Sequence, residues 1–153
     1  MTITMLSVGR MKNACIREAA EDYLKRIKRY AKIRTVDIKD ASGLPVKNAV
    51  KKEAEEILKA VERHDFKVAL CSSGRQMTSE GMAGFISEKM MTSAKGISFI
   101  TGGPYGLAND VYDACGLKLS LSMMTFPHEM ARLILLEQVY RAFTIIKGEP
   151  YSH

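Results

Sequence analysis

The hydrophobic pattern of the chain switches repeatedly between the spacing of strands and the spacing of helices. Short apolar or alternating runs, typical of strands, occupy residues 2–8, 33–38, 66–71, 97–101 and 117–121. Runs with helical spacing lie at about 13–31, 48–63, 109–115 and 127–147, and a further one begins at Thr78. This alternation predicts an α/β fold, with a mostly parallel sheet and helices on both faces. With no internal repeat and no linker, residues 1–153 are expected to form one domain.

The turns that end the strands predict where a ligand binds. In parallel sheets ligands lie beyond the carboxyl ends of the strands, and three loops compete for that place: 70–75, 101–107 and 121–126. Gly102 and Gly103 let the backbone approach a ligand closely, although a plain turn explains them equally well. The loops contain neither the Gly-x-Gly-x-x-Gly fingerprint nor a Walker-type phosphate loop. The site is therefore expected in the C-terminal half, unlike that of the usual dinucleotide fold.

The loop after the last predicted strand combines polar groups with apolar side chains. Ser120, Ser122 and Thr125 alternate with Leu121, Met123, Met124 and Phe126. Such a loop offers backbone amides and carbonyls beside an apolar wall, which suits a flat purine and a thioether or sulfonium better than a polyphosphate. The alternative is that Met123 and Met124 only fill the core.

The last predicted helix, 127–147, is apolar on more than one side, whereas a surface helix shows a single stripe. It is therefore expected to pack against the sheet and also against another subunit. Glu137 and Arg141 are spaced to pair as i,i+4 neighbours, while Arg132 is a candidate for contacting a ligand or a phosphate. The segment Tyr-Ser-His at 151–153 places a phenol, a hydroxyl and an imidazole a few residues beyond this helix.

The composition is that of an ordinary globular domain, with 46% hydrophobic and 26% charged residues. The net charge of +6 and a pI of about 9.3 favour an acidic partner, nucleic acid first, although many domains are mildly basic without such a role. One window without an acid holds much of this charge: Lys25, Arg26, Lys28, Arg29, Lys32 and Arg34. We interpret the first four as a patch that contacts nucleic-acid phosphates. The alternative is a solvated helix end with cations at its C-terminus.

Other residue types exclude several classes of site. Cys15, Cys71 and Cys115 are far apart and the histidines are scattered, so neither a disulfide framework nor a metal site is expected. No run is long and apolar enough to span a membrane. The start of the chain has a strand pattern and lacks a basic leader, so we expect no signal peptide and a cytoplasmic protein.

Several stretches make the sequence recognisable: ITMLSVG at 3–9, GGPYGL at 102–107, LSLSMMTFPH at 119–128, EQVYRAF at 137–143 and PY at 150–151. They resemble the ribosomal RNA large-subunit methyltransferase H family of the SPOUT superfamily, over essentially the whole chain. The resemblance implies methylation of N3 of a pseudouridine in 23S ribosomal RNA, with S-adenosylmethionine as donor and assembled ribosomes as the expected substrate. It also implies a homodimer and a C-terminal trefoil knot that holds the cofactor, although knots are otherwise nearly absent from proteins.

By the same resemblance, the cofactor contacts fall on two groups of residues: Leu70, Gly102 and Gly103, and the loop residues Leu121, Ser122, Met123, Met124, Thr125 and Phe126. The family's C-terminal tail acts on the substrate side and usually reads Pro-Tyr-His. Here Tyr151 matches, Ser152 replaces the histidine and His153 follows.

The chemistry of methyl transfer assigns tasks to these residues. No metal is required, because the methyl group of the sulfonium is already activated. The protein must place N3 in line with that methyl group and help to remove the N3 proton. His153 is the candidate base, and Tyr151 or Arg132 is a candidate stabiliser of the imide anion.

Three alternatives stay open. A non-catalytic RNA-binding protein on the same scaffold would bind RNA but not S-adenosylmethionine. An NAD-dependent dehydrogenase shares the sheet class, yet the early glycine fingerprint is missing. A related methyltransferase acting on another RNA, such as transfer RNA, differs only in its substrate.

Overall fold

The computed structural model describes residues 1–61, 63, 65–92 and 95–151, and its elements alternate as the sequence predicts. The strands are β1 (Thr2–Val8), β2 (Lys32–Ile38), β3 (Asp65–Arg75), β4 (Gly96–Thr101) and β5 (Leu117–Leu119). The helices are α1 (Ala14–Ile27), α2 (Val46–Ala60), α3 (Ser79–Met91), α4 (Asn109–Asp113) and α5 (His128–Lys147).

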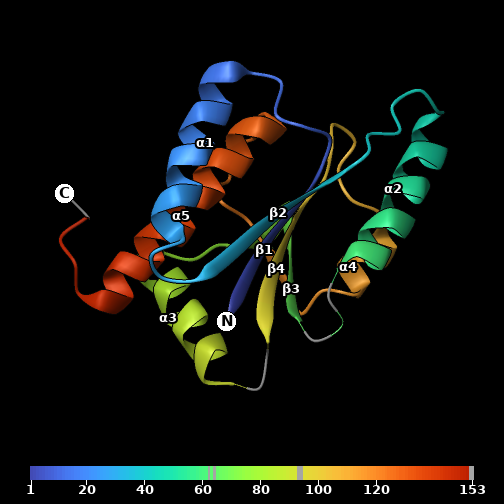
Figure 1. Cartoon of the computed structure of the whole chain (residues 1–153). Coiled ribbons are helices and arrows are strands. Elements are labelled where there is room, and N and C mark those ends of the chain that lie inside the picture. Colours follow the sequence, from blue (N-terminus) through green and yellow to red (C-terminus); the bar gives the residue numbers. More distant parts are fainter. Residues whose placement is uncertain (62, 64, 93–94, 152–153) are drawn as a thin grey trace.

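The strands form one sheet in the order β2-β1-β4-β3-β5, and each neighbouring pair is parallel (Figure 1). Parallel neighbours need a crossover, and a helix supplies one between successive strands. The predicted α/β class is confirmed. Because all strands point the same way, the loops that follow β3, β4 and β5 meet at one edge of the sheet. The trefoil knot implied by the resemblance stays a prediction.

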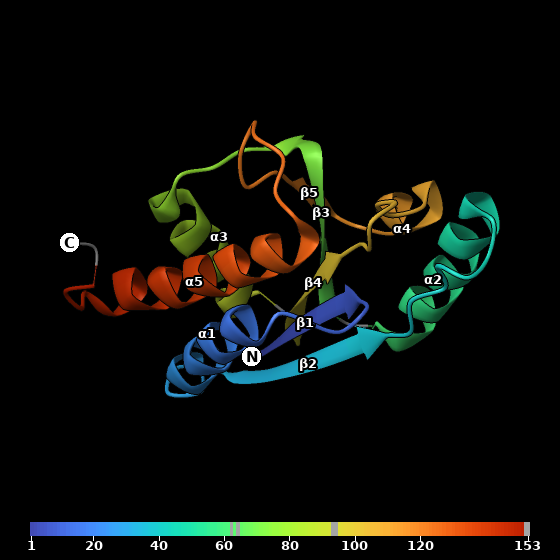
Figure 2. The ribbon, with the colours of Figure 1, turned by 90° about the horizontal axis from the view of Figure 1, so that it is seen from above.

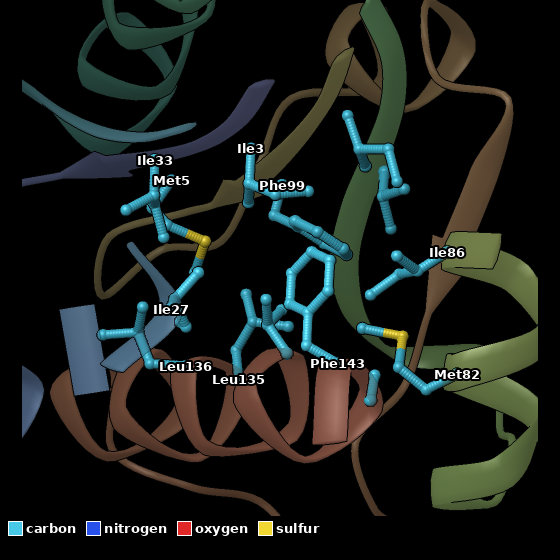
Figure 3. Close-up of a cluster of buried hydrophobic side chains, with 14 of the residues drawn as sticks. Ile3, Met5, Ile27, Ile33, Met82, Ile86, Phe99, Leu135, Leu136 and Phe143 are labelled. Carbon is cyan, nitrogen blue, oxygen red and sulfur yellow. The ribbon is translucent and has the colours of Figure 1, made fainter. Parts of the chain in front are cut away.

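Helices cover both faces of the sheet, as expected: α1, α3 and α5 lie on one face, and α2 and α4 on the other (Figure 2). The alternation of side chains along each strand produces the two cores. In β4, Phe99 points to the first face and Ile100 to the second. Figure 3 shows Phe99 close to Phe143 of α5, which is 1% exposed.

Helix α5 occupies the middle of the three-helix face, between α1 and α3 (Figure 2). Leu135 and Val139 are fully buried against the sheet, while Leu133 and Ile146 are half-buried beside the flanking helices. Packing within one chain thus accounts for much of the all-round hydrophobicity of α5. Its predicted contact with another subunit stays a prediction.

Some predicted boundaries are wrong, for local reasons. The first helix ends at Ile27 rather than near residue 31, because the chain tightens into turns in which the N–H of Tyr30 donates to the carbonyl of Ile27 at 2.9 Å. Strand β3 continues to Arg75, since Gly74 lets it approach β5 closely. A Cβ at Gly74 would lie 2.7 Å from the backbone of Lys118.

The last strand is shorter than predicted, ending at Leu119 instead of residue 121. Ser120 accounts for the difference, because its hydroxyl donates to the carbonyl of Ser122 at 2.9 Å and so starts a turn. This early end makes 120–126 a loop at the edge of the sheet where a ligand is expected.

Glu129, in the first turn of α5, joins two helices that are far apart in sequence. Its carboxylate accepts hydrogen bonds from the N–H groups of Lys12 and Asn13, at 2.9 and 3.1 Å, immediately before α1. The hydrogen bond from Lys12 is the main cause that lowers the pKa of Glu129. Since the carboxylate is partly exposed, its contribution to stability is expected to be modest.

We predict that Glu129→Gln lowers the free energy of unfolding by about 1 kcal/mol or less at neutral pH. A carboxyl whose folded pKa is depressed stabilises the fold above its unfolded pKa, and this contribution disappears as the pH falls through the folded pKa. Urea unfolding of both proteins should therefore show a difference at pH 7 that closes in acid. The exposed Glu18→Gln is the control, and an equal loss in both variants contradicts the capping role.

Candidate functional site

A cavity of about 590 Å³ opens at the carboxyl ends of β3, β4 and β5. It is lined by 70–73, 101–104, 118–122 and 124–126, together with Gly106, Asn109, Tyr112 and Ala131. The structure thus brings together all three loops that the strand ends predicted. Among the predicted cofactor residues only Met123 does not line the cavity.

The glycines after β4 build a tight turn on one side of the cavity. Gly103 and Gly106 form an isolated antiparallel bridge, and the N–H of Gly106 donates to the carbonyl of Gly103 at 3.0 Å. A Cβ at Gly102 would lie 2.6 Å from the carbonyl carbon of Gly106, and Gly106 has a φ of +75°. Only glycine fits such positions. The glycines thus form a plain turn that also presents bare backbone to the cavity, and their contact with a ligand stays a prediction.

Loop 121–126 forms the opposite wall, and hydroxyl groups fix its shape. The N–H of Met124 donates to the hydroxyl of Ser122 at 3.0 Å. Met123 is 90% exposed and Met124 75% exposed, so the interpretation that they fill the core is wrong. Met124 and Phe126 line the cavity as apolar walls, while Met123 projects into solvent.

The polar groups of the lining are uncharged, apart from one cation. Hydroxyls of serine and threonine come from all three loops, and Lys118 lies with its Nζ 5.3 Å from the ring centroid of Tyr112. No carboxylate lines the cavity in the part of the chain that the structure describes. A flat heterocycle with hydrogen-bonding edges suits these walls better than a polyphosphate, which needs several cations.

Sequence reasoning did not find Asn109, Tyr112 and Lys118 as lining residues. The sequence did contain a signal for Asn109 and Tyr112, because their spacing of three residues places them on the same face of the short helix α4. Lys118 lies between Leu117 and Leu119 on β5, and the alternation of a strand sends its side chain away from theirs.

Arg132 is not part of this cavity. Arg132 as a whole is 8% exposed, and its guanidinium donates from Nη1 to the carbonyl of Gly9 and from Nη2 to the carboxylate of Asp37, each at 2.9 Å. It thereby ties α5 to the ends of β1 and β2. It also lines a second cavity of about 320 Å³ between α1, α5 and the β1–β2 edge, with Arg10 and Arg17.

Tyr151 lies at the other end of α5 from the cavity. Its hydroxyl is 3.2 Å from that of Tyr23 on α1, and its ring packs edge-on against Tyr140, with centroids 4.6 Å apart. Its hydroxyl also reaches back along α5 to within 3.4 Å of Oε1 of Glu137. Tyr151 nevertheless does not line the cavity of its own chain. Ser152 and His153 lie outside the described residues.

The basic residues lie at the same end of the molecule as Tyr151. Lys25, Lys28 and Arg29 are exposed around the end of α1. Arg26 is half-buried, pairing with Asp22 at 2.8 Å, and its guanidinium lies 5.7 Å from the ring centroid of Tyr140. The residues predicted to contact nucleic acid and the predicted tail residue thus form one surface.

Among the described residues, no group of three or more His, Cys, Asp or Glu side chains is arranged to hold a metal ion. No helix in the described ranges is long and apolar enough to cross a membrane.

Comparison with known proteins gives the family. The model of the family described as "Predicted SPOUT methyltransferase" matches residues 1–153. "Ribosomal RNA large subunit methyltransferase H" of Carboxydothermus hydrogenoformans is 41% identical to this chain, covering 99% of each protein. The protein of the same name from Halothermothrix orenii is also 41% identical, again over 99% of both.

Solved structures agree on the fold. A probable methylase family protein from Haemophilus influenzae Rd KW20 superposes with a TM-score of 0.57 at 14% identity, covering 99% of this chain and 70% of the other. A probable methyltransferase from Bordetella pertussis Tohama I gives a TM-score of 0.58 at 14% identity, covering 92% and 93%. At such identities the likeness speaks for the fold alone.

Proposed function

We propose that this chain, which belongs to the SPOUT methyltransferase family, transfers a methyl group from S-adenosylmethionine to N3 of a pseudouridine in 23S ribosomal RNA. In this proposal residues 1–153 act as one domain, on assembled ribosomes and therefore in the cytoplasm. The observation that carries it is the cavity at the carboxyl ends of β3, β4 and β5, formed by the loops on which the family resemblance is densest. The names and 41% identity of the ribosomal RNA methyltransferases support the RNA substrate.

The residues present fit an adenosyl sulfonium. Leu70, Gly102, Gly103 and loop 121–126 would hold it, with free backbone on one side and Leu121 and Phe126 as apolar walls. When bound, S-adenosylmethionine supplies an activated methyl group, so the protein needs no metal for this step. The contribution of this chain is then to bind, to orient and to exclude water.

The N3 proton must still be removed. Burial, and after it the hydrogen bond with Tyr23, raises the pKa of Tyr151, so its phenol stays neutral at physiological pH and acts as a hydrogen-bond donor rather than as a base. We therefore keep His153 as the proposed base and Tyr151 as the proposed stabiliser of the imide anion. Arg132 is engaged by Asp37 and Gly9, and we propose that it holds the strand ends instead.

The same arrangement supports a homodimer. Tyr151 does not line the cavity of its own chain, so we propose that segment 150–153 acts on a reacting nucleotide at the cavity of a second copy. We propose that each active site joins the donor cavity of one subunit to the C-terminal segment of its partner.

The function is tested by incubating the protein with methyl-tritiated S-adenosylmethionine and ribosomes from a strain that lacks this gene. Label in a single 23S pseudouridine supports the proposal. Label in transfer RNA alone supports the alternative substrate. RNA binding without any donor binding identifies the non-catalytic alternative.

The basic residues give a separate prediction. We expect the double variant Lys28→Ala, Arg29→Ala to raise the KM for ribosomes several-fold and to leave kcat nearly unchanged, because both side chains are exposed and are proposed to contact phosphates rather than the reacting nucleotide. Each lost phosphate contact lowers the slope of log affinity against log salt by about 0.7 to 0.9. Lys51→Ala, Lys52→Ala on α2, on the opposite face, is the matched control. An unchanged salt slope contradicts the RNA contact.

A further inference from the structure

We infer that Tyr23, Glu137 and Arg141 are positioning residues for methyl transfer. With Tyr140 they form what we call the tail socket, which holds Tyr151 and so sets where segment 151–153 begins. The inference rests on the proposed function, in which that segment acts on the target nucleotide. It assigns a task to groups that do not line the donor cavity.

The hydroxyl of Tyr151 is held by two partners on different helices. It lies 3.2 Å from the hydroxyl of Tyr23 on α1 and donates to Oε1 of Glu137 on α5 at 3.4 Å. The same Oε1 accepts from Nε and Nη2 of Arg141, at 2.8 and 2.6 Å. The phenol therefore meets a carboxylate whose own position is set by a guanidinium that donates twice.

Further contacts hold this carboxylate in place from the side of α3. Oε2 of Glu137 accepts from Nε2 of Gln138 at 2.7 Å, and Oε1 of Gln138 accepts from the hydroxyl of Ser79 at 2.8 Å. The network thus runs from α3 through α5 to α1. The side chains of Glu137 and Arg141 are only 19% and 26% exposed, so the pair is less screened by solvent than a surface ion pair.

The ring of Tyr151 is held as well as its hydroxyl. Tyr140 packs edge-on against it, with an angle of 75° between the ring planes, and the guanidinium of Arg141 lies 4.8 Å from its centroid. Such contacts prefer defined geometries. The socket therefore restricts the orientation of the side chain and not only its place.

The backbone before Tyr151 also folds back towards α1. Gly148 ends α5 with a φ of +67°, and the N–H of Glu149 donates to the carbonyl of Thr144 at 2.9 Å. The hydroxyl of Tyr30, in the turn after α1, donates to the carboxylate of Glu149. The segment after α5 is thus attached to α1 at two points, Tyr30 and Tyr23.

The socket is also joined to the basic surface. The guanidinium of Arg26 lies 5.9 Å from the ring centroid of Tyr23 and 5.7 Å from that of Tyr140. A phosphate bound beside Arg26 would therefore lie at a fixed place relative to Tyr151. The physical purpose we assign to the socket is to keep the C-terminal segment in register with the RNA that the basic residues hold.

The test removes single polar groups and leaves the packing intact. We expect Tyr23→Phe and Glu137→Gln each to lower kcat by about 3- to 10-fold, the size of one hydrogen bond. The Kd for S-adenosylmethionine and the KM for ribosomes should stay unchanged, which separates positioning from binding. Glu88→Gln, an exposed glutamate paired with Lys89 on α3, is the control for the second variant.

A double-mutant cycle with Tyr151→Phe makes the test specific. If Tyr23 acts through the hydroxyl of Tyr151, then Tyr23→Phe should cost nothing further in a Tyr151→Phe chain. Losses that multiply independently overturn the inference. Wild-type kcat in Tyr23→Phe and Glu137→Gln also overturns it, even when deletion of 151–153 is inactive, and the proposed function then stands. Full activity of the deletion removes the proposed role of the segment, and the socket falls with it.

Discussion

Deletion of residues 151–153 is expected to abolish methyl transfer while leaving the affinity for S-adenosylmethionine unchanged. The cavity lies at the carboxyl ends of β3, β4 and β5, and Tyr151, the one residue of the deleted segment that the structure describes, does not line it. The deletion removes His153, the proposed base, and Tyr151, whose single O–H is proposed to exchange its long hydrogen bond to Glu137 for one to the imide anion. General acid–base groups contribute about 100- to 10,000-fold to a rate, so activity should fall by at least about 100-fold.

Calorimetry with the donor and a tritium-methyl assay on ribosomes measure the two halves of this prediction. A mixing experiment tests the partner-subunit arrangement at the same time. The deleted chain, which keeps its cavity, is combined with a chain whose donor site is destroyed by Gly102→Ala. Neither is expected to be active alone, but mixed dimers place an intact cavity beside an intact C-terminal segment. Full activity of the deleted chain contradicts the proposed catalytic role, and failure of the mixture to recover contradicts the exchange between subunits.

The α/β class of the fold was predictable because it depends on the spacing of hydrophobic residues along the chain. Runs such as 66–71 and 97–101 are continuously apolar, as expected of strands buried on both faces, and helical spacing separates them. Their order in the sheet was not predictable, since β1 pairs with β4 through contacts far apart in sequence. The predicted boundaries of elements were wrong where a single side chain decides the boundary, as Ser120 does at the end of β5.

The donor cavity was predictable for a similar reason. Loops after parallel strands meet at one edge whatever the strand order, so three loops could be grouped without knowing the neighbours of each strand. Met123 is the exception. Its place between two residues that face the cavity gave no sign that its side chain would be 90% exposed.

Arg132 and Tyr151 show where such reasoning stops. A buried arginine close to the start of α5 has the same appearance in sequence whether it meets a ligand or, as here, Asp37. Tyr151 follows the cavity loop 121–126 closely in the sequence. Most of the residues between them form one helix, α5, which is about 30 Å long. The spatial distance between two residues can therefore be predicted from their separation in the sequence only when the structure of the segment between them is known.

Gly102→Ala is expected to weaken binding of S-adenosylmethionine by more than about 100-fold, and kcat/KM should fall with it. The new Cβ would lie 2.6 Å from the carbonyl carbon of Gly106 and 2.7 Å from its oxygen, distances that folded proteins do not tolerate. These atoms cannot move freely, because Gly106 is bridged to Gly103. The turn must therefore open, and the wall that it presents to the cavity is lost.

Gly84→Ala is the matched control, since it adds the same methyl group at an exposed site on α3 where nothing lies within 4 Å. Within a helix this change stabilises by up to about 1 kcal/mol, and it should leave the Kd for the donor unchanged. Calorimetry and thermal unfolding of the two variants separate a local effect from a global one. If Gly102→Ala binds the donor as wild type does, the turn after β4 is only a connection between elements. The donor would then have to be held by loop 121–126 and Leu70 without the bare backbone opposite them.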